Sequence, residues 1–234
     1  DAQESRGLGD VYKRQVLGHA ARAYYELFCL PSMAPGRVAA MLQVEGPAWS
    51  LFRQAYERGQ GIILAITHQS SFDLAGQAVA ARGFRMFVMV LPDQAGGFAF
   101  INQMRQRQGI QIIPAGPRAV REAIRALRQG RVVVMGGDRP IKGQGTVVEF
   151  FGRPTLLPDG SVRLALHTGA SLFVAACHRE KGQYRLILEP LELARSGDTE
   201  ADVRENMQKL ARAMEPIIRA HPEQWHLLQQ LWEE

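Results

Sequence analysis

Short apolar runs alternate along the chain with longer segments in which apolar residues recur at helical spacing. The runs are rich in β-branched residues and carry few polar positions, which is typical of strands buried in a parallel sheet. We predict strands at 61–66, 84–91, 110–114, 131–135, 146–150, 172–178 and 184–188. We predict helices at 17–30, 47–58, 74–82, 98–108, 117–129, 161–168 and 200–221. This alternation predicts an α/β fold, with a mostly parallel (mixed) central sheet and helices on both faces.

One predicted strand ends just before a histidine that has a carboxylate five positions further on. The apolar run 62–66 leads to His68, and Asp73 lies in the first turn of a helix that begins near Phe72. A tight strand-to-helix turn can bring both side chains to the carboxyl edge of the sheet, where open α/β folds build their sites. Because histidine titrates near neutral pH, the spacing indicates a general base with an acid that orients it. A buried structural histidine and an ordinary first-turn acid are the alternative.

Length and composition fit a single domain. The chain has 234 residues, of which 46% are hydrophobic, and no stretch of it resembles a linker. Its two cysteines, Cys29 and Cys177, are far apart, which favours a reducing compartment without a disulfide framework. The segment 10–15 resembles the translation of a transposon adapter used in preparing sequencing libraries. We therefore expect residues 1–15 to be a non-native, disordered segment and residues 16–234 to form an N-terminally truncated domain.

The formal net charge of +5 favours an anionic partner. Four arginines recur every three or four residues and would form one stripe on the predicted helix 117–129; they are Arg118, Arg121, Arg125 and Arg128. A solvated helix face is the alternative for this stripe. We find no nucleic-acid-binding motif, so we expect no nucleic acid among the partners. Four histidines have no spacing with acids or cysteines that is typical of metal ligands, and we expect no metal and no cofactor; they are His167, His178, His221 and His226.

Several motifs, in this order along the chain, resemble one superfamily of acyltransferases. The first, His68-x4-Asp73 after a strand, resembles the signature of the glycerolipid and lysophospholipid acyltransferases. Three later stretches, at 137–139, 148–154 and 157–170, are similar to the branch that holds the bacterial lipid A late acyltransferases and the phosphatidylinositol mannoside acyltransferase. The stretches 24–33 and 221–232 resemble the mannoside acyltransferase side of that branch, and the likeness runs from about residue 20 to the end.

The resemblance implies that His68 is the base and leaves two acids for its partner. The superfamily motif favours Asp73, whereas the mannoside acyltransferase branch favours Asp138, which precedes Arg139 and follows two glycines. We rank the two acids equally; the alternative for Asp138 is a turn acid paired with Arg139. Because no Gly-x-Ser-x-Gly elbow is present, we expect direct attack by the acceptor and no acyl-serine intermediate.

Further residues are expected to bind the substrate. Backbone amides at 69–71, or a basic side chain such as Arg105, could hold the oxyanion. The stretch 150–160, read as a loop between a strand and a helix, resembles the motif that shapes the substrate groove, and Arg153 could meet a phosphate bidentately. The predicted substrate-binding set is Gln69, Ser70, Ser71, Arg105, Arg139, Gly152, Arg153, Pro154, Pro158 and Gly160.

The implied function is acyl transfer at a membrane. We expect an O-acyltransferase that moves a fatty acyl group from acyl-CoA or acyl-ACP, as co-substrate, to a hydroxyl of a glycolipid or lysophospholipid acceptor. No apolar run reaches the roughly 18–20 residues that span a bilayer, so we expect peripheral attachment to the cytoplasmic face of the bacterial plasma membrane. The aromatic residues of 24–30 and the tryptophan-containing segment 225–232 could provide that attachment, although docking on the sheet is the alternative. A lipid-binding protein without turnover and an ester hydrolase are the rival functions.

Overall fold

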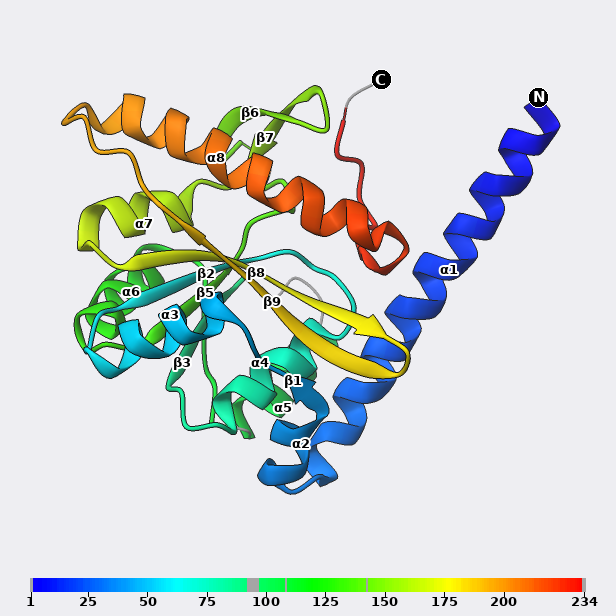
Figure 1. Cartoon of the computed structure of the whole chain (residues 1–234), viewed down its shortest axis with the longest axis horizontal. Coiled ribbons are helices and arrows are strands. Elements are labelled where there is room, and N and C mark those ends of the chain that lie inside the picture. Colours follow the sequence, from blue (N-terminus) through cyan, green and yellow to red (C-terminus); the bar gives the residue numbers. More distant parts are fainter. Residues whose placement is uncertain (1, 92–96, 108, 142, 233–234) are drawn as a thin grey trace.

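The computed structural model describes residues 2–91, 97–107, 109–141 and 143–232 of the chain (Figure 1). Within these residues the central sheet has seven strands, in the order β1-β9-β8-β2-β5-β3-β4. Their bounds are β1 Leu42–Gln43, β2 Ile62–Ile66, β3 Met86–Val90, β4 Gln111–Pro114, β5 Val132–Gly136, β8 Ser171–Glu180 and β9 Gln183–Leu191. All neighbouring strands pair in parallel except β8 and β9, which are antiparallel. The predicted α/β class with a mostly parallel sheet is therefore confirmed.

Helices cover both faces of this sheet (Figure 1). They are α1 Ala2–Cys29, α2 Pro35–Met41, α3 Pro47–Glu57, α4 Phe72–Ala80, α5 Gly97–Arg107, α6 Pro117–Arg128, α7 Gly160–Thr168 and α8 Thr199–Ala220, with short 3-10 turns η1 Leu30–Ser32 and η2 Pro222–Gln224. Alternate residues of β2 enter two different core clusters: Ile63 and Ala65 pack with α6, α7 and α8, whereas Ile62 and Leu64 pack with α2, α3 and α4. Because both faces of β2 are buried, its apolar run has no polar alternation.

Three elements differ from the prediction at the start of the chain. Helix α1 begins at Ala2 and so includes residues 2–15, which we expected to be disordered; their non-native origin stays a prediction. In Figure 1 the first part of α1 extends away from the sheet, and its last part packs beside α4. Helix α2 and the two-residue strand β1 were not predicted, because each is too short to show a periodicity. No helix of the described residues is long and apolar enough to cross a bilayer.

A separate hairpin replaces one predicted strand of the central sheet. Strand β6 (Thr146–Phe150) pairs antiparallel with β7 (Arg153–Leu157) and not with the seven-stranded sheet. The two residues between them, Phe151 and Gly152, have φ values of 53° and 75°, as in the type I′ turns that join tight hairpins. The prediction of a loop across 150–160 is therefore wrong. Phenylalanine rarely adopts a left-handed conformation, so the turn lacks its usual sequence signal.

Candidate active site

His68 and Asp138 meet at the carboxyl edge of the central sheet. Strands β2 and β5 are parallel neighbours, and their last residues, Ile66 and Gly136, are paired in register. The segments that leave these strands therefore lie side by side, although they are distant in sequence. Nδ1 of His68 lies 2.6 Å from Oδ1 of Asp138.

The Asp138 carboxylate is fully buried, with 0% of its side chain exposed. Its Oδ2 accepts hydrogen bonds from the His68 backbone N–H at 2.7 Å and from Trp225 Nε1 at 2.8 Å. Burial acts to raise the pKa of Asp138, but the His68 imidazole and these donors outweigh it and hold the pKa below its ordinary value. The ionised carboxylate can only accept hydrogen bonds, so Nδ1 of His68 carries the ring proton and Nε2 of the neutral ring is left as a base.

Packing fixes the plane of the His68 ring. A Cβ atom on Gly136 would lie 2.9 Å from Cε1 of His68, so only glycine lets the imidazole approach the end of β5. On another side Phe72 meets the ring edge-on, with the ring centroids 5.1 Å apart. The His68 side chain nevertheless keeps 15% of its surface exposed, which leaves it access to a substrate.

Asp73, the other acid that we ranked for this role, is bound elsewhere. Its two carboxylate oxygens accept hydrogen bonds from Nε and Nη2 of Arg105 on α5, at 2.5 and 2.9 Å. Burial acts to lower the pKa of Arg105, but the charge of Asp73 outweighs it and raises that pKa above its ordinary value, so the guanidinium stays ionised. The structure thus places Asp138 against His68 and leaves Asp73 and Arg105 as an ion pair between α4 and α5.

A segment near the C-terminal end of the chain closes the site, and we call residues 224–226 the strap. The Gln224 carbonyl accepts a hydrogen bond from the Ser70 N–H, and the His226 N–H donates to the His68 carbonyl, both at 2.8 Å. Arg139 donates to the His226 carbonyl at 2.7 Å, so this predicted substrate ligand holds the strap and does not pair with Asp138. We expected Trp225 to lie in a segment that attaches to the membrane; in the structure its indole N–H donates to Asp138. Only the likeness of 221–232 to a family stretch pointed to this region.

The amides expected to hold an oxyanion already have partners inside the protein. The Gln69 N–H donates to the Thr67 carbonyl at 2.9 Å, the Ser70 N–H to the strap, and the Ser71 N–H to the sulfur of Cys177. The oxyanion role that we predicted for these amides is therefore not supported by the geometry. Burial raises the pKa of Cys177 to about 12, so this nearby cysteine stays a neutral thiol.

The side chains of the same turn are also used within the fold. The amide of Gln69, fully buried, bonds the Thr67 hydroxyl at 2.9 Å and the His221 carbonyl at 3.3 Å. Ser71 donates to the carboxylate of Glu26 on α1, which also accepts a hydrogen bond from the Tyr184 hydroxyl. These contacts tie α1 and the C-terminal end of α8 to the turn that carries His68.

The remaining predicted ligands lie in and after the β6–β7 hairpin. Gly152 is in its turn, Arg153 and Pro154 begin β7, and the guanidinium of Arg153 lies 5.6 Å from the Trp232 ring centroid. Pro158 and Gly160 follow β7, and a Cβ on Gly160 would lie 2.9 Å from the end of the Met135 side chain on β5. The hairpin reaches the site through Phe151, whose ring packs 6.1 Å from that of Trp225.

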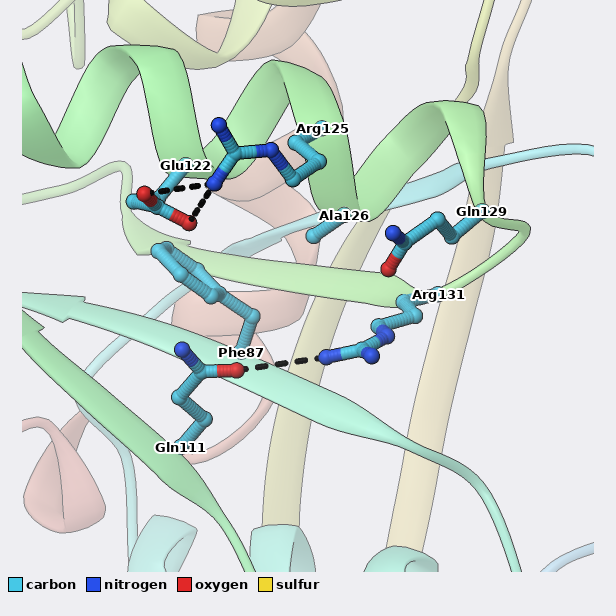
Figure 2. A pocket seen from close by; sticks show the side chains of 7 residues that line it. All are labelled: Phe87, Gln111, Glu122, Arg125, Ala126, Gln129 and Arg131. Atoms are coloured by element: carbon cyan, nitrogen blue, oxygen red, sulfur yellow. Dashed lines mark hydrogen bonds and ion pairs between the residues drawn. The ribbon is translucent and has the colours of Figure 1, made fainter.

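Arg125, from the arginine stripe of α6, lies towards the opposite edge of the sheet. A cavity of about 290 Å³ there is lined by Phe87, Gln111, Glu122, Arg125, Ala126, Gln129 and Arg131. Figure 2 shows Arg125 turned onto Glu122, at 2.7 Å, and Arg131 onto Gln111, at 3.2 Å. Gln111 begins β4 and Arg131 precedes β5, so this cavity is at the amino ends of the strands, away from His68.

Comparison of the sequence with known proteins places the chain in a family. The model of the bacterial lipid A biosynthesis acyltransferases matches residues 12–234. The phosphatidylinositol mannoside acyltransferase of Mycobacterium tuberculosis (strain CDC 1551 / Oshkosh) is 32% identical over 216 residues, which are 90% of this chain and 67% of the relative. The protein of the same name from Mycolicibacterium smegmatis is 30% identical over 227 residues, which are 94% of this chain and 71% of the relative. The chain therefore belongs to the bacterial lipid A biosynthesis acyltransferase family.

Proposed function

We propose that this acyltransferase moves a fatty acyl group from a thioester, carried by coenzyme A or acyl carrier protein, to a hydroxyl of a glycolipid, with His68 as general base and Asp138 as its orienting acid. The observation that carries the proposal is the 2.6 Å contact between Nδ1 of His68 and the buried Asp138 carboxylate. This contact makes Nε2 the nitrogen of His68 that faces away from the carboxylate and can act as the base.

The proposed reaction is a direct transfer. Nε2 of His68 takes the proton of the acceptor hydroxyl as its oxygen bonds to the thioester carbonyl carbon. The tetrahedral intermediate then expels the thiolate, which receives the proton from the imidazolium, so an ester and a free thiol are the products. Asp138 stabilises the imidazolium while it exists. General-base catalysis of this kind contributes roughly 10²- to 10⁴-fold in rate.

The acceptor that we propose is a phosphatidylinositol mannoside, with a lysophospholipid as the alternative. The support is the likeness to two mycobacterial phosphatidylinositol mannoside acyltransferases, each matched over at least 90% of this chain. An acceptor of this class has sugar hydroxyls that a base can deprotonate and a phosphate that carries negative charge. The positive net charge of +5 suits such an anionic lipid.

We further propose that the protein works as a peripheral protein on the cytoplasmic face of the plasma membrane. Exposed aromatic side chains on α1 and α5 support this: Tyr24, Tyr25, Phe28 and Phe100 expose 45%, 68%, 52% and 54% of their surfaces. The rings of Phe28 and Phe100 lie 6.1 Å apart, so the two helices share one aromatic surface. Aromatic side chains of this kind suit the headgroup region of a bilayer.

Thioester consumption with and without acceptor tests the proposal. Purified protein is given a long-chain acyl-CoA, or the same acyl group on acyl carrier protein, and released thiol is measured with and without phosphatidylinositol mannoside. Thiol release that requires the acceptor, with the acylated lipid found by mass spectrometry, is the expected result. Release without acceptor would indicate a hydrolase, and binding without release would indicate a lipid-binding protein.

Two histidine variants test the base. His68→Ala should lower acyl transfer at least ~10²-fold while the circular dichroism spectrum stays unchanged. His167→Ala, at an exposed position on α7, is the matched control and should keep the parent rate. Parent-like turnover by folded His68→Ala protein would refute the proposed mechanism.

A further inference from the structure

Two histidines and a glutamate converge beside the strap, outside the residues of the proposed reaction. His178 and Glu180 are near the end of β8, and His221 follows α8. The nearest ligand atoms of the three side chains all lie within 4.8 Å of one another. Nε2 of His221 is 3.2 Å from Oε1 of Glu180, and the two imidazole rings lie 4.7 Å apart at 71°.

His178 brings a buried nitrogen without a partner to this cluster. The residue is only 4% exposed, and its Nε2 makes no hydrogen bond. The backbone carbonyl of Ile217 on α8 lies near its ring. A buried polar atom without a partner is costly in a folded protein, so a ligand bound to this nitrogen would be stabilising.

The surroundings of both rings match those of metal-binding histidines. Such histidines nearly always have their second ring nitrogen bonded to a carboxylate or a backbone carbonyl. Nδ1 of His221 lies 3.3 Å from Oε1 of Glu223, and His178 has the carbonyl of Ile217. In His221 the nitrogen that faces Glu180 is Nε2.

We propose that His178, Glu180 and His221 bind a divalent transition-metal ion, with Zn²⁺ as the ion that best suits two imidazoles and a carboxylate. Bond lengths of about 2.0–2.1 Å in a tetrahedral site separate ligand atoms by roughly 3.3 Å. The 3.2 Å spacing of His221 and Glu180 already fits, and His178 needs a side-chain shift of about 1.5 Å at most. A water molecule supplies the fourth ligand from the exposed side of Glu180.

The charges around the cluster favour a cation. Glu180 and Glu223 are two carboxylates in contact with His221. Arg179, the neighbouring cation on β8, directs its guanidinium to the Tyr184 ring, 5.8 Å from the centroid. The sequence led us to expect no metal, because Glu180 and His221 are 41 positions apart and meet only in the folded chain.

The ion would join the end of β8 to the segment that leads into the strap. His221 lies three positions before Gln224, whose side chain already bonds the Arg179 backbone twice, at 2.8 and 2.9 Å. A bound ion therefore adds a second link between β8 and the segment that places Trp225 on Asp138. Its role is structural, and it stands apart from the proton transfer proposed for His68.

Metal binding by tag-free protein tests this site. After dialysis against a weak chelator, we expect the parent to retain about one Zn²⁺ per chain and to give visible absorption bands of tetrahedral Co²⁺ when that ion replaces zinc. Zn²⁺ at ~100 times Kd should raise Tm by roughly 5–10 °C. Chelation should speed hydrogen exchange at the Ser70 and His226 amides, which bond to and within the strap.

Matched variants identify the ligands. His221→Gln and Glu180→Gln, both partly exposed, should each weaken Zn²⁺ binding at least ~10-fold, and Glu223→Gln, one step removed from the ion, roughly 10-fold. His167→Gln should bind zinc like the parent. No zinc uptake by folded parent, or parent-like affinity in both His221→Gln and Glu180→Gln, overturns the site. Zinc uptake without slower exchange at those two amides overturns its link to the strap.

Discussion

Replacing Asp138 with asparagine would remove the negative charge of the side chain and keep its shape. In the structure Oδ2 of Asp138 accepts two hydrogen bonds, from the His68 backbone and from Trp225, whereas Oδ1 faces Nδ1 of His68. The single oxygen of an asparagine can satisfy both donors only at the Oδ2 position. Its NH₂ group then faces Nδ1, which must accept, so the ring proton moves to Nε2.

A histidine protonated on Nε2 cannot take a proton through that atom. The same exchange in a Ser-His-Asp triad lowers kcat by about 10⁴-fold, for the same reason of the wrong tautomer. A factor of 10⁴ corresponds to about 5.5 kcal/mol of transition-state stabilisation. We therefore expect Asp138→Asn to lower kcat roughly 10³- to 10⁴-fold, with only a small loss of folding stability, because the neutral amide keeps its hydrogen-bond partners.

Asp73→Asn is the matched control, because Asp73 contacts Arg105 and not His68. It should weaken the ion pair between α4 and α5 but leave the His68 tautomer unchanged, so its loss in kcat should be at least ~10-fold smaller. Steady-state acyl transfer by folded variants, monitored by thiol release, measures both effects. Equal losses in the two variants, or an Asp138→Asn enzyme with more than a tenth of the parent kcat, would refute the assignment of Asp138.

Three further outcomes follow from the site geometry. Gly136→Ala should push the His68 ring from its place, because the new Cβ would lie 2.9 Å from Cε1, and should lower kcat roughly 10²-fold without unfolding the protein; parent activity would contradict this. Trp225→Phe removes a donor from the Asp138 carboxylate and should lower the free energy of unfolding in urea by about 1.5–3 kcal/mol; an unchanged value would show that the hydrogen bond contributes nothing. Burial, with Arg139 nearby, lowers the pKa of His226 from 6.5 to about 4, so the unfolded chain binds the proton more readily than the folded chain. The contribution of His226 to the free energy of unfolding should be fully present above pH 6.5 and should fall as the pH is lowered towards 4. His226→Gln should flatten this pH dependence.

The elements that the sequence predicted well are those whose environment is uniform along their length. Strands β2 and β5 are buried on both faces, so their apolar runs were visible, and helix α6 shows a strong alternation of arginine with apolar residues. Strand β6 was predicted, but its partner β7 was missed because the turn between them, Phe151-Gly152, carries an unusual residue in a left-handed conformation. Local sequence cannot signal a backbone conformation that tertiary packing imposes.

The site was predictable only in part, for a similar reason. His68 could be named from a strand end, whereas Asp138 was named from the resemblance to the mannoside acyltransferase branch and follows another predicted strand, and parallel strands deliver their carboxyl ends to one edge. The choice between Asp138 and Asp73 depended on the order of strands in the sheet, which places β5 directly beside β2. The position of the strap depends on where the segment after α8 packs against the turn that carries His68, and the periodicity of the sequence does not predict that contact.

The hydrogen bond between Trp225 and Asp138 joins residues 87 positions apart, and this has a consequence for the timing of biosynthesis. At ~5–20 residues per second, a ribosome needs roughly 4–17 s to make the chain between them. During that interval a nascent chain can already hold its histidine and aspartate but not the indole that completes their environment. The hydrogen bonds to the Asp138 carboxylate are therefore complete only after the segment that follows α8 has been made and has returned to the sheet.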